Sequence, residues 1–312
     1  MSAPVVAVVG STMIDMIAYL QRTPAAGETI AGEEFALGFG GKGANQAVMA
    51  RLLGAEVVMV NSLGDDVFAE MTLANFAEHG IDTTHVTRVA GCSSGVAPIW
   101  VEADGTNRIV VVAGANARMT EEQARGAVTG LPRLDLVLGQ FEIPQEVTTA
   151  AFRAARSRGA VTVLNPAPAA RVAPELLAVT DWILPNETEF ADLARSFGLA
   201  VSGIDDPAIV ALAGALGTRL AVTLGERGAA VLGADGHVHR IAPPEVTARD
   251  TTGAGDAFVG AFGYALASGR DELAAARLGC ACASASVTRP GTQKSFPTGD
   301  SLHSARTWAT TA

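Results

Sequence analysis

The chain has 312 residues, of which 49% are hydrophobic and 17% are charged, and its formal net charge at pH 7 is −10. This composition excludes an intrinsically disordered protein, and the length suffices for one large α/β domain. The negative charge argues against nucleic acid or an anionic membrane surface as the main partner. It does not exclude binding of a phosphorylated nucleotide, because local N–H groups, single basic residues and Mg²⁺ can offset the charge of a phosphate.

The cysteines and the N-terminal segment indicate the cellular compartment in which the protein resides. The three cysteines, Cys92, Cys280 and Cys282, are odd in number and lack the spacing of a disulfide framework, which indicates a reducing compartment. Cys280 and Cys282 lie two residues apart in an apolar helical stretch, and we expect them to be small core residues. The N-terminal segment MSAPVVAVVG lacks the basic region and the apolar length of a signal peptide, and no apolar run approaches a membrane span. We therefore expect a cytoplasmic protein without a membrane partner.

Short Val/Ile/Leu-rich runs alternate with amphipathic stretches along the chain, which predicts a mainly parallel sheet covered by helices on both faces. The expected strands are 5–9, 56–60, 135–138, 160–164, 181–184 and 220–224, and the clearest helices are 45–53, 65–80 and 257–266.

Two segments depart from this alternation of strands and helices. Residues 28–39 partly alternate like a strand pair, and residues 94–113 have the pattern of a hairpin that turns at Asp104 and Gly105. We expect a small antiparallel layer that projects from the main sheet. An antiparallel edge of the same sheet is the alternative.

The polar and glycine-rich loops follow the predicted strands. They are 10–15, 165–169, 186–189, 225–228 and 250–256. Ligands of open α/β sheets bind outside the carboxyl ends of the strands, so five such loops predict one site at one edge of the sheet.

The loop Asp250-Thr251-Thr252-Gly253-Ala254-Gly255-Asp256 carries the strongest chemical signal. Gly253, Ala254 and Gly255 leave backbone N–H groups unhindered at the start of a predicted helix, where the helix dipole favours an anion. Asp256 places a possible base beside that anion site, which is the arrangement needed for phosphoryl transfer to a hydroxyl. The alternative is a tight turn followed by an ordinary helix cap.

A second glycine-rich segment, GFGGKGAN at 38–45, opens another predicted helix. Its glycines match the dinucleotide pattern G-x-G-x-x-G, but that pattern should close the first strand, which here ends about thirty residues earlier. An NAD(P) site remains an alternative, whereas a Walker A loop is excluded because Gly43 follows Lys42. We favour close backbone approach to a small polyol, with Lys42 and Asn45 bonding its hydroxyls.

Two carboxylates, one predicted helix N-terminus and one loop are the remaining candidate ligand-binding groups. Asp15 and Glu142 each follow a predicted strand and could accept hydrogen bonds from a diol, or could cap turns. Asn186 with Glu189 has the spacing of a helix N-cap, and the same group could orient Mg²⁺ waters and phosphates. In the glycine-containing loop 223–228, Arg227 could supply positive charge or be solvated.

Together these segments resemble the ribokinase family of carbohydrate kinases over nearly the whole chain. The matching segments, in order, are GST..D, GFGGKGANQAV, a lid-like hairpin, AGAN, NPAPA, PNETE, TLGERG, DTTGAGDAFVGAF and VTRPGTQKSFP. The resemblance implies a single ribokinase-like α/β domain over 1–312, with a β lid formed by about 13–40 and 94–113. It also implies a homodimer joined through that lid.

The implied reaction is transfer of the ATP γ-phosphate to a sugar hydroxyl, with O5 of D-ribose as the expected acceptor. Asp256 would be the base, and the anion hole would be formed by Gly253, Ala254 and Gly255. The implied sugar contacts are Asp15, Gly41, Lys42, Gly43, Asn45, Glu142 and Asp256. The implied nucleotide contacts are Asn186, Thr223, Gly225, Glu226, Arg227, Gly228, Gly255 and Cys280. Glu189 would organise Mg²⁺, and a K⁺ ion would be held by Asp250, Thr252, Ser286, Arg289, Gly291 and Ser295.

One position departs from the family pattern. Met13 stands two residues before Asp15, where some ribokinases have Asn, so one polar contact to the sugar is lost. A kinase for 2-deoxyribose or another pentose is therefore the nearest alternative. An NAD(P)-dependent oxidoreductase and a non-catalytic sugar sensor are the alternatives from other classes.

Overall fold

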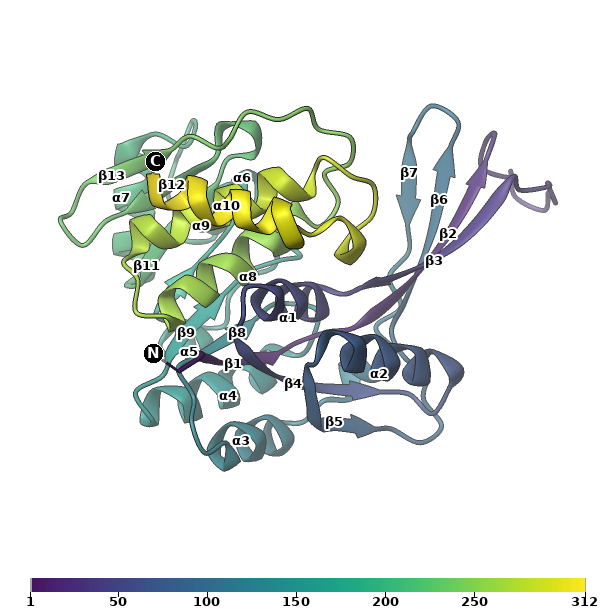
Figure 1. Ribbon diagram of the computed structural model, residues 1–312, viewed down its shortest axis with the longest axis horizontal. Helices are drawn as coiled ribbons and strands as arrows, with labels where there is room; N and C mark the ends of the chain where they lie inside the picture. The colour runs from purple at the N-terminus through teal and green to yellow at the C-terminus, as the bar shows by residue number, and fades with distance from the viewer. Residues whose placement is uncertain (1, 312) are drawn as a thin grey trace.

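In the computed structural model, which describes residues 2–311, nine strands form one sheet in the order β13-β12-β11-β10-β9-β8-β1-β4-β5 (Figure 1). All neighbours are parallel except β11 with β12 and β12 with β13. The strands of this sheet are β1 (Val5–Val9), β4 (Glu56–Leu63), β5 (Asp82–Arg88), β8 (Leu136–Gly139), β9 (Val161–Leu164), β10 (Trp182–Ile183), β11 (Arg219–Thr223), β12 (Ala229–Leu232) and β13 (Val238–Ile241).

Helices cover both faces of the sheet. The helices on one face are α1 (Lys42–Leu52), α2 (Val67–His79), α8 (Ala254–Ala267), α9 (Glu272–Ser286) and α10 (Gly299–Thr311), and those on the other are α3 (Glu121–Gly130), α4 (Gln145–Ser157), α5 (Pro174–Leu177), α6 (Glu187–Ser196) and α7 (Asp206–Leu216). Each face of the sheet has its own hydrophobic core. In β1, Val6 and Val8 pack into the core under α1 and α8, whereas Ala7 and Val9 pack into the core under α3 and α4. A strand buried on both faces needs the unbroken apolar run that the sequence shows.

A second sheet of four strands projects from the main body at the upper right of Figure 1. Its order is β3 (Glu34–Gly40), β2 (Met13–Leu20), β6 (Val96–Glu102) and β7 (Asn107–Ile109). The predicted mixed α/β fold with a small second sheet is confirmed, although one of its three pairings, β2 with β6, is parallel.

Two local predictions were wrong. Residues 10–15 are not one loop, because β2 already begins at Met13, and residues 28–39 do not pair with themselves, because the single strand β3 pairs with β2. Most residues of β2 are partly exposed on both faces, so the strand lacks the alternation that would have revealed it. Within residues 2–311, no helix combines the length and the apolar character required to cross a bilayer.

Candidate active site

A cleft of about 200 Å³ opens at the carboxyl ends of β9, β10 and β11 and beside the start of α8. It is lined by Lys42, Asn165, Ala167, Leu184, Asn186, Glu189, Thr223, Gly253, Gly255, Asp256 and Val259. Seven of these residues were predicted from the sequence to contact sugar, nucleotide or metal or to form the anion hole, and the fold brings all seven to one place.

The first turn of α8 is open toward the cleft. Gly253 is the N-cap residue and has φ 78°, and a Cβ at this position would lie 2.5 Å from Thr292 Cγ2. A Cβ on Gly255, in contrast, would meet no described atom within 4 Å. The helix N-terminus is therefore unobstructed, and such a terminus attracts an anion through its free N–H groups and its dipole.

Asp256 lies in this first turn, is only 8% exposed and lines the cleft. Its Oδ2 accepts a hydrogen bond from Asn45 Nδ2 at 2.8 Å, and its Oδ1 accepts one from Gln46 Nε2 at 3.1 Å. Because a carboxylate oxygen has two lone pairs, each oxygen keeps capacity to accept a proton or a hydrogen bond from a ligand hydroxyl.

The glycine-rich turn before α1 is held between two strand ends. Gly41 has φ 87°, and a Cβ on Gly43 would lie 2.6 Å from the backbone nitrogen of Ser11, so neither position accommodates a side chain without strain. Glu142 accepts a hydrogen bond from Lys42 N at 2.9 Å and another from the Ser11 hydroxyl. The turn after β1 and the turn after β8 thus fix the place where α1 starts.

The charges around Lys42 are mainly negative. Burial opposes the charged ammonium, but the carboxylates of Asp256, Glu142 and Glu189 outweigh it and raise the pKa of Lys42. Lys42 therefore stays protonated in the cleft, as a cation that bonds hydroxyl or phosphate oxygens must.

Asp15 lies on β2 opposite the glycines of β3. A Cβ on Gly40 would lie 2.6 Å from both carboxylate oxygens of Asp15, so the small residue there leaves space for that carboxylate. Burial, with further contributions from Glu142 and Asp256, raises the pKa of Asp15 from 3.8 to about 6. The folded protein thus holds an ionised carboxylate at neutral pH at a cost in stability.

Replacing Asp15 by Asn is expected to stabilise the fold at pH 7.5 by roughly 3 kcal/mol, since one pKa unit corresponds to about 1.4 kcal/mol. The folded-state pKa is raised, so the penalty is absent below pH 4, grows between pH 4 and 6, and is complete above pH 6. Urea unfolding of both proteins at pH 4, 5, 6 and 7.5 measures the difference. A constant difference across these pH values would contradict the assignment to Asp15 ionisation.

The nucleotide side of the cleft begins at α6. Asn186 and Glu189 form a complete capping box, with Glu189 N donating to Asn186 Oδ1 and Asn186 N donating to Glu189 Oε2, both at 2.9 Å. The predicted helix cap is therefore confirmed, while a role toward Mg²⁺ and phosphates stays a prediction. Burial raises the pKa of Glu189.

Other predicted nucleotide contacts lie outside the residues that line the cleft. Gly225 and Glu226 sit in the turn after β11, and the Arg227 guanidinium forms an ion pair with Glu187. Gly228 has φ 80°, and a Cβ there would lie 2.0 Å from the carbonyl oxygen of Ile241, so this glycine is needed for the approach of β13.

Cys280 belongs to the core face of α9. It is 3% exposed, and burial raises the pKa of its thiol to about 12. The predicted role of Cys280 and Cys282 as small buried residues of an apolar helix is confirmed, because both belong to the core between α8, α9 and the sheet. In this structure no atom of Cys280 lines the cleft.

The predicted K⁺ residues gather at the loop after α9. Asp250 accepts hydrogen bonds from Thr252 N at 2.9 Å and from Gly291 N at 2.8 Å. Arg289 donates to the carbonyl oxygen of Ser295 at 3.0 Å, and the Ser286 hydroxyl donates to Ala283 O at 2.8 Å. Carbonyl and carboxylate oxygens of this kind fit a hard cation. Among residues 2–311, no group of three His, Cys, Asp or Glu side chains is placed to hold a metal ion.

Sequence reasoning missed the buried amides around Asp256. The residues concerned are Gln46, Gln140, Asn75 and Gln293. Only Gln46 had a signal, because it directly follows Asn45 in the glycine-rich motif.

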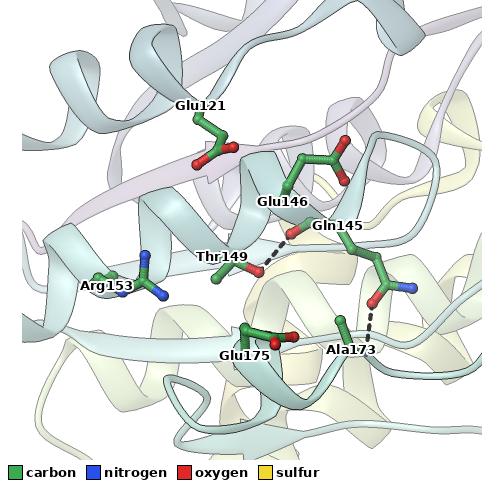
Figure 2. A pocket seen from close by; sticks show the side chains of 7 residues that line it. All are labelled: Glu121, Gln145, Glu146, Thr149, Arg153, Ala173 and Glu175. Atoms are coloured by element: carbon green, nitrogen blue, oxygen red, sulfur yellow. Dashed lines mark hydrogen bonds between the residues drawn. The ribbon is translucent and has the colours of Figure 1, made fainter.

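A larger hollow, of about 350 Å³, lies among α3, α4 and α5 and shares no residue with the cleft (Figure 2). Two hydrogen bonds join residues of its lining, since Thr149 Oγ1 donates to Gln145 O at 2.7 Å and Ala173 N donates to Gln145 Oε1 at 2.9 Å. Three glutamates and one arginine line it, with no nucleophile beside a base, so the hollow offers no catalytic arrangement.

Known proteins that resemble this chain in sequence and in structure match it over almost its whole length. The sequence profile of the pfkB family of carbohydrate kinases matches residues 4–299. The chain is 40% identical to a deoxyribokinase of Salmonella typhi, covering 94% of this chain and 95% of that protein. It is 38% identical to a ribokinase of Bacillus subtilis, covering 94% and 96%. The crystal structure of a ribokinase from Thermotoga maritima superposes with a TM-score of 0.87 at 32% identity, covering 97% of this chain and 99% of that one.

Proposed function

The chain belongs to the pfkB family of carbohydrate kinases and is a phosphotransferase with a sugar acceptor, and we propose that it phosphorylates D-ribose at O5 with ATP to give ribose 5-phosphate and ADP. The observation that carries this proposal is the position of Asp256. Its carboxylate lies in the first turn of α8, beside the unobstructed backbone of Gly255, and lines the cleft. A base next to an anion site is the arrangement that phosphoryl transfer to a hydroxyl requires.

In the proposed mechanism the sugar hydroxyls are held by Lys42, which lines the cleft, and by Asp15, Asn45 and Glu142, which do not line it but adjoin Lys42 and Asp256. Asp256 accepts the proton of the attacking hydroxyl. The N–H groups at the start of α8 stabilise the charge on the transferring phosphoryl group. Most of the rate then comes from positioning and charge stabilisation, because phosphoryl transfer needs little covalent participation by the protein.

Two cations belong to the proposal. Mg²⁺ accompanies ATP and would be organised through Glu189, whose carboxylate lines the cleft. K⁺ would be held at Asp250 and the loop after α9 by oxygen atoms. When bound, Mg²⁺ supplies positive charge to the phosphates. ATP, Mg²⁺ and K⁺ are all cytoplasmic solutes, and we place the protein in the cytoplasm, which cell fractionation tests.

A specific observation favours 2-deoxy-D-ribose as a second acceptor. Met13 lies two residues before Asp15 on β2, so both side chains point to the same face of the strand. Its side chain is 4% exposed, and its sulfur lies 3.8 Å from Asn116 Nδ2. An apolar thioether offers no strong hydrogen bond to a hydroxyl, which lessens the disadvantage of a sugar that lacks one. A deoxyribokinase is also among the relatives that cover most of the chain.

The test is an ADP-release assay with Mg-ATP and a panel of ribose, 2-deoxyribose, arabinose, xylose and fructose, with K⁺ or with Na⁺. We expect turnover with ribose and with 2-deoxyribose, increased by K⁺ and abolished by EDTA. The variant Met13→Asn is expected to raise the ratio of kcat/KM for ribose to that for 2-deoxyribose severalfold, because the amide can bond the additional hydroxyl. Lack of turnover with every sugar would contradict the proposed function.

We also propose that the protein forms a homodimer through the second sheet. Large apolar side chains are exposed on its strands and on the segment that follows β7. They are Tyr19, Phe35, Leu37 and Ile109 on the strands, and Val110, Val111 and Val112 after β7. Exposed apolar patches of this kind mark association surfaces. Sedimentation of the wild type and of Phe35→Asp tests the proposal, and a wild type that stays monomeric at about 50 μM, where any dimer with a micromolar Kd would form, would refute it.

A further inference from the structure

Asp256 is the end point of two chains of buried amide side chains. In the first, Asn75 Nδ2 donates to Gln293 Oε1 at 2.9 Å, and Gln293 Nε2 donates to Asn45 Oδ1 at 3.0 Å. Asn45 Nδ2 then donates to Asp256 Oδ2 at 2.8 Å. None of the four side chains is more than 8% exposed.

The second chain reaches the other oxygen of the same carboxylate. Gln140 Nε2 donates to Gln46 Oε1 at 2.6 Å, and Gln46 Nε2 donates to Asp256 Oδ1 at 3.1 Å. Gln46 Nε2 also lies 3.2 Å from Asn165 Oδ1. Both glutamines are fully buried. The amides of these two chains bond one another inside the protein, except that Gln140 Oε1 is buried without a hydrogen-bond partner.

The direction of donation is the same along both chains, and the carboxylate determines it. An ionised carboxylate can only accept, so Asn45 and Gln46 must turn their NH₂ groups toward Asp256. Their carbonyl oxygens then face Gln293 and Gln140, which must present NH₂ groups in turn. Donors lined up in one direction polarise one another and strengthen the final bond. The whole network thus matches the ionised form of Asp256.

The charges in the cleft explain why such support is needed. Asp256 shares the site with Asp15 on β2, Glu142 after β8 and Glu189 on α6, and these carboxylates act on one another electrostatically. Lys42 on α1 is the cation facing the same group. Hydrogen bonds donated to a carboxylate favour its charged form.

We propose that Gln46 and Gln293 are positioning residues that keep Asp256 ionised and oriented as the base, Gln46 by direct donation and Gln293 through Asn45. The inference rests on the proposed function for its consequence in catalysis. Its structural part concerns the ionisation of Asp256 and can be measured without turnover.

The experiment follows the carboxyl band of Asp256 by infrared difference spectroscopy between pH 4 and 9, with Asp256→Asn as the spectral reference. Gln46→Met removes one donor at nearly constant volume and is expected to move the ionisation of Asp256 to higher pH by about one unit. Gln293→Met is expected to move it in the same direction by less, because Asn45 keeps its place but loses its fixed orientation. The acid limb of kcat against pH should move with the infrared transition in each variant.

Gln123→Met is the matched control. Gln123 Nε2 donates to Asn61 O at 2.8 Å, and Gln123 Oε1 accepts from Ser62 Oγ at 3.1 Å, but neither bond leads to Asp256. This variant should leave the infrared transition and the kcat profile unchanged. If Gln46→Met fails to fold, Gln293→Met is the deciding variant, since Gln293 lies in the short 3₁₀ turn after α9 and outside the main helices and strands.

Unchanged ionisation of Asp256 in folded Gln46→Met and Gln293→Met would overturn the inference, even in a fully active kinase. An inactive wild type in which the transition still moves would refute the proposed function and leave the inference supported. The two failures are therefore distinguishable.

Discussion

The variant Asp256→Asn is expected to lower kcat by more than a hundredfold with every accepted sugar. General base catalysis contributes about 10²–10⁴ in rate, and an amide cannot take the proton of the attacking hydroxyl. The substitution leaves KM for ATP nearly unchanged, because the phosphates are proposed to meet the backbone of α8. Steady-state kinetics at saturating sugar and ATP measure the loss.

Asp271→Asn is the matched control for this change. Asp271 is the exposed N-cap of α9 and accepts a hydrogen bond from Ala274 N at 2.7 Å, and Asn caps a helix about equally well. Its kinetics should equal those of the wild type. Retention of the full rate in a folded Asp256→Asn protein would contradict the proposed mechanism and favour a binding protein or a different chemistry.

The variant Gly255→Ala is expected to lower kcat/KM for ATP by roughly 10- to 100-fold, since displacing reacting groups by about 1 Å can cost that much. A Cβ at Gly255 would extend into open space within the cleft and meet no described atom within 4 Å. The fold should therefore tolerate the methyl group, which instead occupies the approach of the phosphoryl group to the helix N-terminus. Thermal unfolding together with kinetics as a function of ATP separates the two effects.

Gly214→Ala gives the same chemical change on α7, where the added Cβ would also meet no described atom within 4 Å. Alanine is favoured over glycine in a helix interior by about 1 kcal/mol, so this control should raise Tm slightly and leave the kinetics unchanged. A Gly255→Ala protein with wild-type kcat/KM for ATP would show that the start of α8 does not receive the phosphates.

The sequence predicted most of the main sheet, because its signals are local. An unbroken apolar run such as Val5–Val9 is the pattern of a strand buried on both faces, and the structure places that run in β1 between two cores. The capping box of Asn186 and Glu189 was readable because both partners lie within one helical turn. The glycines before α1 and α8 likewise indicated where helices start.

What the sequence could not determine depends on partners far apart in the chain. The contact of Gln293 with Asn45 joins residues separated by 248 positions, and no local pattern distinguishes Gln293 from a solvated surface glutamine. The parallel pairing of β2 with β6 and the position of Cys280 outside the cleft lining were likewise decided by tertiary packing.

By itself, then, the sequence determined the family resemblance, the mixed α/β fold and the residues that start each functional turn, since backbone conformation and helix capping depend on near neighbours. The tertiary structure alone decided which side chains surround Asp256 and which direction their amides face. The physical reason is that a buried polar group must find its partner inside the fold, and the packing of α1, α2, α8 and the loop after α9 determines which partner is within reach.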